Sequence, residues 1–183
     1  MDDFLKGTNL YLVGMMGAGK STLGKILAHD LGYRFADTDA VIEQAAGQPI
    51  SAIFAQDGES AFRALETQVL GQLASYTRMA IATGGGIVIE RKNWSYLQHG
   101  VVVWLDVSVD LLYDRLKGDQ ARPLLQAPDP KQVLQTLLNQ RRSLYAQADV
   151  TISVTEPQAP EAIAAQVLDR IRSILRPPHS TAE

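Results

Sequence analysis

The residues most able to do chemistry lie in a glycine-rich stretch from Gly14 to Ser21. It fits G-x-x-x-x-G-K-[ST], in which glycines let the backbone wrap phosphate closely and point N–H groups at its oxygens. Lys20 is expected to reach the β- and γ-phosphates of a bound nucleotide, and the Ser21 hydroxyl to ligate Mg²⁺, without the loop backbone depending on the Lys20 ammonium. The alternative is a glycine-rich turn that binds nothing. The residues expected to bind the nucleotide here are Gly17, Ala18, Gly19, Lys20, Ser21 and Thr22.

Two aspartates follow a second predicted strand. Asp37 and Asp39 come directly after the segment 33–36, where ligands of open α/β sheets bind. One acid can lie near Mg²⁺ and the other near a substrate hydroxyl. An N-cap of the following helix is an equal alternative, and one aspartate can do both.

Arg63 and Glu66 are spaced to share one face of a helix. On their own they are typical of a solvated ion pair. The alternative is an arginine that Glu66 holds and aims at a substrate carboxylate.

Further candidates are a glycine triplet and two arginines. Gly84, Gly85 and Gly86 follow the apolar segment 79–82, and three glycines favour close approach of a ligand over a plain loop. Arg122 lies in an irregular segment suited to a lid, and Arg141 on a long helix after it. A single arginine of this kind is more often a surface residue.

The elements that must position these residues alternate between apolar strands and helical patterns, which is typical of a parallel α/β sheet. We expect strands at about 9–13, 33–36, 79–83, 101–106 and 150–153, of which 33–36 is the weakest because it contains Arg34. We expect helices at about 20–31, 38–46, 50–56, 58–75, 90–97, 108–116, 130–147 and 159–175.

The domain organisation follows from the same pattern. Residues 1–176 are expected to form a single domain, with substrate-binding helices at about 38–75. A mobile lid is expected at about 114–128, since prolines, aspartates and a glycine break the rhythm between Lys117 and Asp129. Residues 177–183 are expected to be a disordered tail.

Composition excludes several classes of protein. The 183 residues are 46% hydrophobic and carry a net charge of −3, which argues against nucleic-acid binding. Without cysteine there is neither a disulfide nor a thiolate metal site. No apolar run is long enough to span a membrane, and the acidic start lacks the apolar core of a signal peptide. We therefore expect a cytoplasmic protein, and a monomer.

Together, and in this order, these motifs resemble the shikimate kinase family over about residues 9 to 175. The resemblance implies Mg²⁺-dependent transfer of the ATP γ-phosphoryl group to the 3-hydroxyl of shikimate, on the route to aromatic amino acids. It also implies a three-layer α/β/α P-loop kinase fold with a five-stranded parallel sheet, similar to nucleoside-monophosphate kinases. The motifs that carry it are Gly14 to Ser21, Asp37-x-Asp39, Phe62-Arg63-x-x-Glu66, Gly84 to Gly86, Arg122-Pro123-Leu124-Leu125 and Arg141-x-x-Leu144-Tyr145.

The resemblance also implies roles for single residues. Lys20, Asp39 and Arg122 are the implied catalytic residues, Arg122 as a lid arginine that touches nucleotide phosphate. Ser21 matches a Mg²⁺ ligand, and Asp37 an outer-sphere partner of that ion. Gln158 lies in the segment that corresponds to the adenine loop. The implied shikimate contacts are Asp39, Arg63, Gly84, Gly85, Gly86 and Arg141.

Three other functions compete with this interpretation. A gluconate kinase and a nucleoside-monophosphate kinase have the same architecture, but the glycines after Thr83 and the Phe62-Arg63-x-x-Glu66 run argue against both. A non-catalytic relative is the third, and it is disfavoured because Lys20, Asp39 and the arginines are all present.

Overall fold

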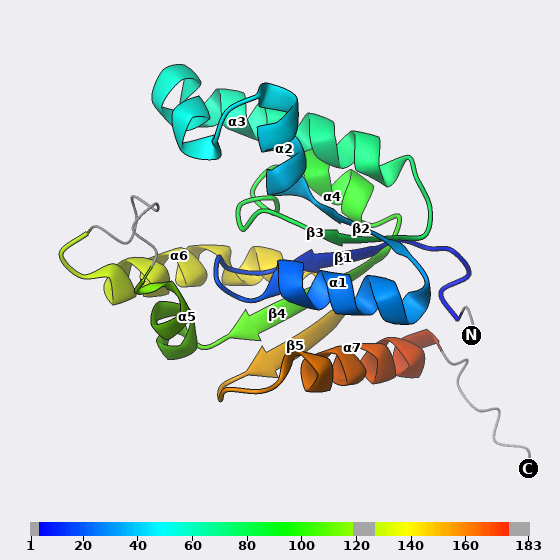
Figure 1. The fold of residues 1–183 in the computed structure, drawn as a ribbon. Coiled ribbons are helices and arrows are strands. Elements are labelled where there is room, and N and C mark those ends of the chain that lie inside the picture. Colours follow the sequence, from blue (N-terminus) through cyan, green and yellow to red (C-terminus); the bar gives the residue numbers. More distant parts are fainter. Residues whose placement is uncertain (1–3, 119–126, 176–183) are drawn as a thin grey trace, which may run out of the picture.

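The centre of the molecule is a parallel sheet of five strands in the order β2-β3-β1-β4-β5 (Figure 1). It is seen in a computed structural model that describes residues 4–118 and 127–175. Every expected strand forms, each bound within one residue of the prediction, and the strand that contains Arg34 is among them. The strands are β1 Leu10–Val13, β2 Arg34–Asp37, β3 Met79–Ala82, β4 Val101–Val107 and β5 Val150–Val154.

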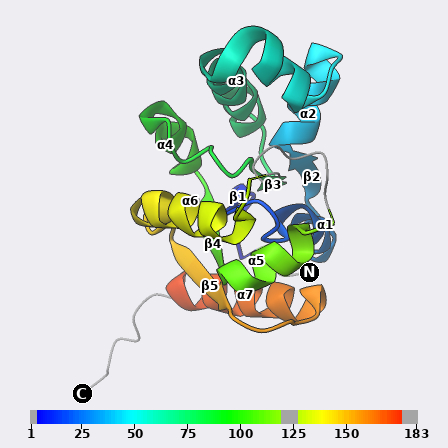
Figure 2. The same ribbon diagram turned by 90° about the vertical axis from the view of Figure 1, so that its left-hand side faces the viewer.

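Helices cover both faces of the sheet and make the expected three layers. Figure 2 shows α4 and α6 on one side of the strands and α1 on the other, where α1 also packs on α7. Because both faces are covered, β1 and β3 are buried along their whole length and consist of apolar residues throughout. The helices are α1 Lys20–Leu31, α2 Thr38–Ala46, α3 Ile50–Ala74, α4 Arg91–Leu97, α5 Val109–Leu116, α6 Pro130–Tyr145 and α7 Pro160–Leu175.

Two helices expected at 50–56 and 58–75 are continuous in α3. The backbone leaves helical geometry only at Gly58, with φ 80° and ψ 175°, a conformation that is essentially restricted to glycine. The two expected segments therefore join end to end across a kink.

The helices α2 and α3 project beyond the β2 edge of the sheet (Figure 1). They have a small hydrophobic core of their own, formed by Ile42, Ile53, Phe62 and Val69. The larger core lies around the sheet, and Leu73 packs against both. The predicted substrate-binding helices thus form a separately packed unit.

The strand order changes the direction of the chain at the centre of the sheet. The chain leaves β1 toward β2 on one side and leaves β4 toward β5 on the other, although β1 and β4 are neighbours. Such a change of direction is where open α/β sheets bind ligands. The loops after β1, β2 and β3, which contain the predicted site residues, all meet at this edge.

Parts of the predicted lid and tail lie outside the described residues. Within the expected lid, residues 114–116 end α5 and residues 119–126 are not described, nor is the expected tail at 177–183. None of the helices in the described part of the chain has the length and apolarity that crossing a membrane requires.

Candidate active site

The loop after β1 folds as a phosphate-binding loop. Gly14 has φ 142°, and a side chain there would press on the Leu105 carbonyl oxygen, because its Cβ would lie 2.8 Å from that atom. Gly19 has φ 95° and supplies no side-chain cap to α1. The N-terminal end of α1 can therefore direct backbone N–H groups and its positive dipole end at an anion.

Lys20 lies inside this loop rather than in solvent. Its Nζ donates hydrogen bonds to the carbonyl oxygens of Gly14 and Met15, each at 2.8 Å, and only 8% of the residue is exposed. The expectation that the loop backbone does not depend on this ammonium is therefore wrong. Two buried carbonyls of the loop use it as a donor.

Asp37 serves two neighbours at once. Its Oδ1 caps α2 by accepting hydrogen bonds from the N–H groups of Asp39 at 3.0 Å and Ala40 at 3.4 Å. Its Oδ2 accepts a hydrogen bond from the Ser21 hydroxyl at 2.5 Å. The capping interpretation is thus confirmed, and the contact with Ser21 brings together the two residues predicted to lie at Mg²⁺.

Arg63 and Glu66 form a buried pair, so the interpretation as a solvated ion pair is wrong. Arg63 Nη1 lies 2.7 Å from Glu66 Oε2, and the Glu66 side chain is fully buried. Arg63 is held a second time by Glu59, at 3.2 Å. Burial raises the pKa of Glu66, the charge of Arg63 opposes the rise, and Asp39 adds to it.

The three glycines after β3 each face a charged or loop neighbour. A Cβ on Gly84 would meet carboxylate oxygens of Asp39 at 2.7 Å and Glu66 at 2.8 Å, and a Cβ on Gly86 would overlap the guanidinium group of Arg63. Because Gly84 and Gly86 have no side chains, there is room for those of Asp39, Glu66 and Arg63. Contact of these glycines with a ligand stays a prediction.

Gly85 connects the two halves of the site. A Cβ there would lie 3.4 Å from the Met16 nitrogen in the phosphate-binding loop and 3.7 Å from Arg141 Nη1 on α6. The predicted acceptor residues and the phosphate-binding loop therefore meet around one glycine. Arg141 comes from a position 56 residues further along the chain, and the sheet brings it there.

Of the predicted residues Arg122 and Gln158, the structure describes only Gln158. Arg122 is outside the described residues. Gln158 lies on the surface between β5 and α7, where its side-chain oxygen accepts a hydrogen bond from Gln166 at 2.9 Å.

Sequence reasoning missed Arg115 on α5. Its Nη1 donates to the carbonyl oxygens of Gly17 at 3.1 Å and Ala18 at 3.2 Å, so this cation lies against the phosphate-binding loop. The only signal for it was its position at the start of the predicted lid, in the last turn of the helix expected at 108–116.

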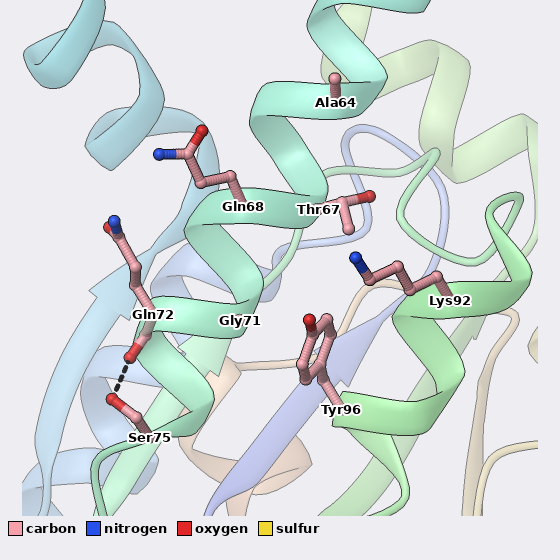
Figure 3. A pocket seen from close by; sticks show the side chains of 8 residues that line it. All are labelled: Ala64, Thr67, Gln68, Gly71, Gln72, Ser75, Lys92 and Tyr96. Atoms are coloured by element: carbon pink, nitrogen blue, oxygen red, sulfur yellow. Dashed lines mark hydrogen bonds between the residues drawn. The ribbon is translucent and has the colours of Figure 1, made fainter.

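A separate groove of about 550 Å³ lies between α3 and α4 (Figure 3). Figure 3 shows Gln68 and Gln72 pointing away from Lys92 and Tyr96, so few polar groups converge in it. We place this groove outside the candidate site. Its lining residues are Ala64, Thr67, Gln68, Gly71, Gln72, Ser75, Lys92 and Tyr96.

The side chains present suit a metal ion that is bound mainly by phosphate and water and by few protein atoms. Within residues 4–118 and 127–175, no group of three or more His, Asp or Glu side chains is placed to hold a metal ion. Mg²⁺ in phosphate-transfer sites is typically bound through one or two protein oxygens, with water and phosphate completing its shell. The paired oxygens of Ser21 and Asp37 fit such an ion.

Comparison with known proteins gives a consistent result. The family model for shikimate kinase matches residues 16–172. A shikimate kinase from Trichormus variabilis is 57% identical over 176 residues, covering 96% of this chain and 97% of the relative. The structure of a shikimate kinase from Acinetobacter baumannii in complex with shikimate matches with TM-score 0.88 and 43% identity, over 93% of this chain and 96% of that one.

The competing gluconate kinase is a more distant match. A gluconokinase from Sinorhizobium meliloti has TM-score 0.57 and 19% identity over 92% of this chain and 94% of its own. A likeness at that level shows a shared fold alone. With a family match across most of its length and a relative more than half identical over nearly all of it, this chain belongs to the shikimate kinase family.

Proposed function

We propose that this chain transfers the γ-phosphoryl group of ATP to the 3-hydroxyl of shikimate and needs Mg²⁺. One observation carries the proposal beyond family membership. The partly buried cluster of Asp39, Arg63 and Glu66 meets the phosphate-binding loop at the glycine turn, with Gly85 between the loop and Arg141. An acceptor bound there lies next to the end of the nucleotide where transfer takes place.

The charges around the turn are complementary to shikimate, a small carboxylate that carries hydroxyl groups. Arg63 and Arg141 can hold the carboxylate through charge-assisted hydrogen bonds, and Arg63 is already oriented by Glu66. Asp39, close to Gly84, can accept hydrogen bonds from the hydroxyls. Gly84, Gly85 and Gly86 line the space between these groups.

Phosphoryl transfer needs positioning and charge neutralisation more than covalent help. The 3-hydroxyl oxygen forms a bond to the γ-phosphorus while the bond from that phosphorus to the β,γ-bridging oxygen breaks, and ADP leaves. In this proposal Asp39 orients the hydroxyl and can accept its proton. Lys20 neutralises charge on the β- and γ-phosphates, and Arg122 adds charge from the lid, whose closure excludes water.

The phosphate-binding loop would hold the nucleotide through backbone N–H groups of Gly17, Ala18 and Gly19 and through Ser21 and Thr22. Ser21, with Asp37 as its hydrogen-bond partner, would hold Mg²⁺, and the ion would supply positive charge to the nucleotide phosphates. Asp37 orients the Ser21 hydroxyl through the hydrogen bond already present. Gln158 is assigned to the adenine end, and a monomeric enzyme stays our prediction.

A coupled assay that follows ADP release tests this proposal. Purified protein is given ATP and Mg²⁺ with shikimate, gluconate or AMP in parallel. We expect turnover with shikimate, none above background with the other two acceptors, and loss of turnover when EDTA removes Mg²⁺. Phosphorylation of gluconate or AMP with shikimate left unchanged would overturn the proposal.

A further inference from the structure

Tyr145 ends the last of the shared motifs, and the proposed chemistry gives it no role. It is the final residue of α6 and is fully buried. Its ring stacks on Trp104, with centroids 5.7 Å apart and an interplanar angle of 21°. Its hydroxyl lies 3.7 Å from the sulfur of Met15 and donates a hydrogen bond to the Gly85 carbonyl oxygen at 2.6 Å.

That last hydrogen bond ties the glycine turn to a distant element. The Gly84 and Gly86 carbonyls accept hydrogen bonds from Ile87 at 3.1 Å and Ile89 at 3.0 Å, both from the turn itself. The Gly85 carbonyl is held instead by a hydroxyl 60 residues away. Consecutive glycines have the widest backbone freedom of any residues, so fixing this peptide group needs a partner from outside the turn.

The same hydroxyl lies beside Arg141, whose charge and side-chain hydrogen bond act on the pKa of Tyr145. Residues four apart on a helix share a face, so Arg141 and Tyr145 face the turn together. Arg141 Nη1 lies 3.7 Å from the point where a Gly85 side chain would begin. Burial raises the pKa of Tyr145 while the charge of Arg141 opposes the rise, so the hydroxyl keeps its proton and donates at neutral pH.

We propose that Tyr145 is a positioning residue for the acceptor: its hydroxyl holds the Gly85 carbonyl against α6, so that the glycine turn and Arg141 present one preformed surface to the substrate carboxylate. The inference rests on the proposed function, because the surface is the one assigned to shikimate. Tyr145 itself touches neither substrate. Its contact with Met15 lies on the buried side of the phosphate-binding loop. We therefore expect loss of the hydroxyl to weaken binding of the acceptor more than binding of the nucleotide.

Tyr145→Phe removes only the hydroxyl and keeps the ring stacked on Trp104. We expect the KM for shikimate to rise about 3- to 10-fold, as for one lost buried hydrogen bond, and the KM for ATP to change less than about twofold. Amide hydrogen exchange of residues 84–89 should become faster, because the Gly85 peptide group has lost its tether. This second readout does not depend on turnover.

Tyr11→Phe is the matched control. Tyr11 is as deeply buried, and burial raises its pKa while the neighbouring Asn9 side chain opposes the rise. Its ring packs at Gly100, just before β4, at the amino-terminal end of the strands and so away from the candidate site. We expect this variant to lose comparable stability in urea unfolding, with both KM values and the exchange of residues 84–89 unchanged.

The outcomes separate the two proposals. An active unmodified enzyme whose shikimate KM and turn exchange are the same in Tyr145→Phe would overturn this inference and leave the proposed function standing. An equal rise in both KM values, or the same rise in Tyr11→Phe, would show a general loss of structure and would also overturn it. An unmodified chain without shikimate turnover would overturn the proposed function instead.

Discussion

At the residue scale, the predicted acceptor site is built around the turn of three glycines after β3. Two carboxylates and two guanidinium groups surround this turn. Glu66 is buried beside Arg63, and both Glu66 and Asp39 lie against Gly84. Burial of an ion pair often adds little net stability, because desolvation offsets the attraction. We therefore expect these charges to serve binding first. Removing one partner alone should also lower stability, because it leaves the other charge buried and unpaired.

The pKa of Glu66 gives a prediction for pH. It is raised above the ordinary 4.5, chiefly by burial. A carboxyl whose pKa is higher in the folded state contributes stability below its unfolded pKa, and that contribution is lost as the pH rises through its folded pKa. Glutamine does not titrate, so the unfolding free energy of the unmodified chain relative to Glu66→Gln should fall from pH 4 toward pH 8. Urea unfolding across that range measures it, and parallel curves would contradict the assignment.

The arginines are expected to separate by ligand. Arg63→Ala and Arg141→Ala should each weaken shikimate binding by about 1.5–3 kcal/mol, the range for a hydrogen bond to a charged group, with little change for ATP. Arg63→Lys should restore only part, because a point charge cannot make two parallel bonds. Arg122→Ala should act mainly on turnover, through nucleotide phosphate.

Calorimetric titration with each ligand tests this separation, and the chain offers a close control. Arg142 adjoins Arg141 but is paired with Asp106 at 3.3 Å and lies over the Trp104 ring. Arg142→Ala should leave shikimate affinity within about twofold, since a surface pair contributes little. Loss of shikimate affinity alone in Arg122→Ala would reverse the assignment.

Lys20→Ala should damage both catalysis and the loop. We expect kcat to fall at least about 10²-fold, as when other preorganised electrostatic donors are removed. Two buried carbonyls also lose their donor, which should lower the unfolding free energy by about 1–3 kcal/mol. Lys25→Ala, which removes an exposed lysine of the same helix, is the control. Near-normal turnover in a folded Lys20→Ala variant would refute the role.

At the element scale, the glycine turn packs so closely against α3 that a side chain on Gly84 or Gly86 would clash with Glu66 or Arg63. Strand bounds were predictable within a residue, because β1, β3 and β4 are apolar runs and β5 alternates between buried and exposed residues. The signal was weakest for β2, which contains the exposed Arg34. Gly58 marked the break in α3. The packing of Gly84 and Gly86 against Asp39, Glu66 and Arg63 was not predictable, because only the folded sheet brings these segments together. The bond from Tyr145 to Gly85 spans 60 residues and leaves no local pattern.

Gly86→Ala tests that packing. The new methyl group would overlap the Arg63 guanidinium, so we expect Arg63 to shift and the KM for shikimate to rise at least about tenfold, with the ATP KM little changed. The estimate corresponds to one displaced charge-assisted hydrogen bond. Gly71→Ala is the control, since its methyl group would press on Tyr96 at 3.1 Å, on the groove between α3 and α4. Equal kinetic effects in the two variants would contradict the prediction that Arg63 needs the space beside Gly86.

At the scale of the whole molecule, two hydrophobic cores divide the protein. The sheet core holds the phosphate-binding loop, and the small core under α2 and α3 holds the helix that contains Arg63 and Glu66. A small core supports less stability than a large one, so the α2–α3 unit should open locally before the sheet unfolds.

Amide hydrogen exchange of the ligand-free chain measures this order. We expect amides of α2 and of the first half of α3 to exchange at least about tenfold faster than those of β1 and β4, a difference of about 1.4 kcal/mol in opening free energy. Shikimate should slow exchange in the α2–α3 unit. Uniform exchange across both cores would mean that the molecule opens as one cooperative unit.

The meeting of the two cores at Leu73 has a consequence for how such an enzyme can diverge. Substitutions among Ile42, Ile53, Phe62 and Val69 reshape the platform under the acceptor while the nucleotide end keeps its own support. Substitutions in the α2–α3 core can therefore change the acceptor that is bound while the phosphate-binding loop on the sheet core keeps its structure. A lineage that changes its substrate should accumulate its altered residues on α2 and α3, and inherit the loop after β1 nearly intact.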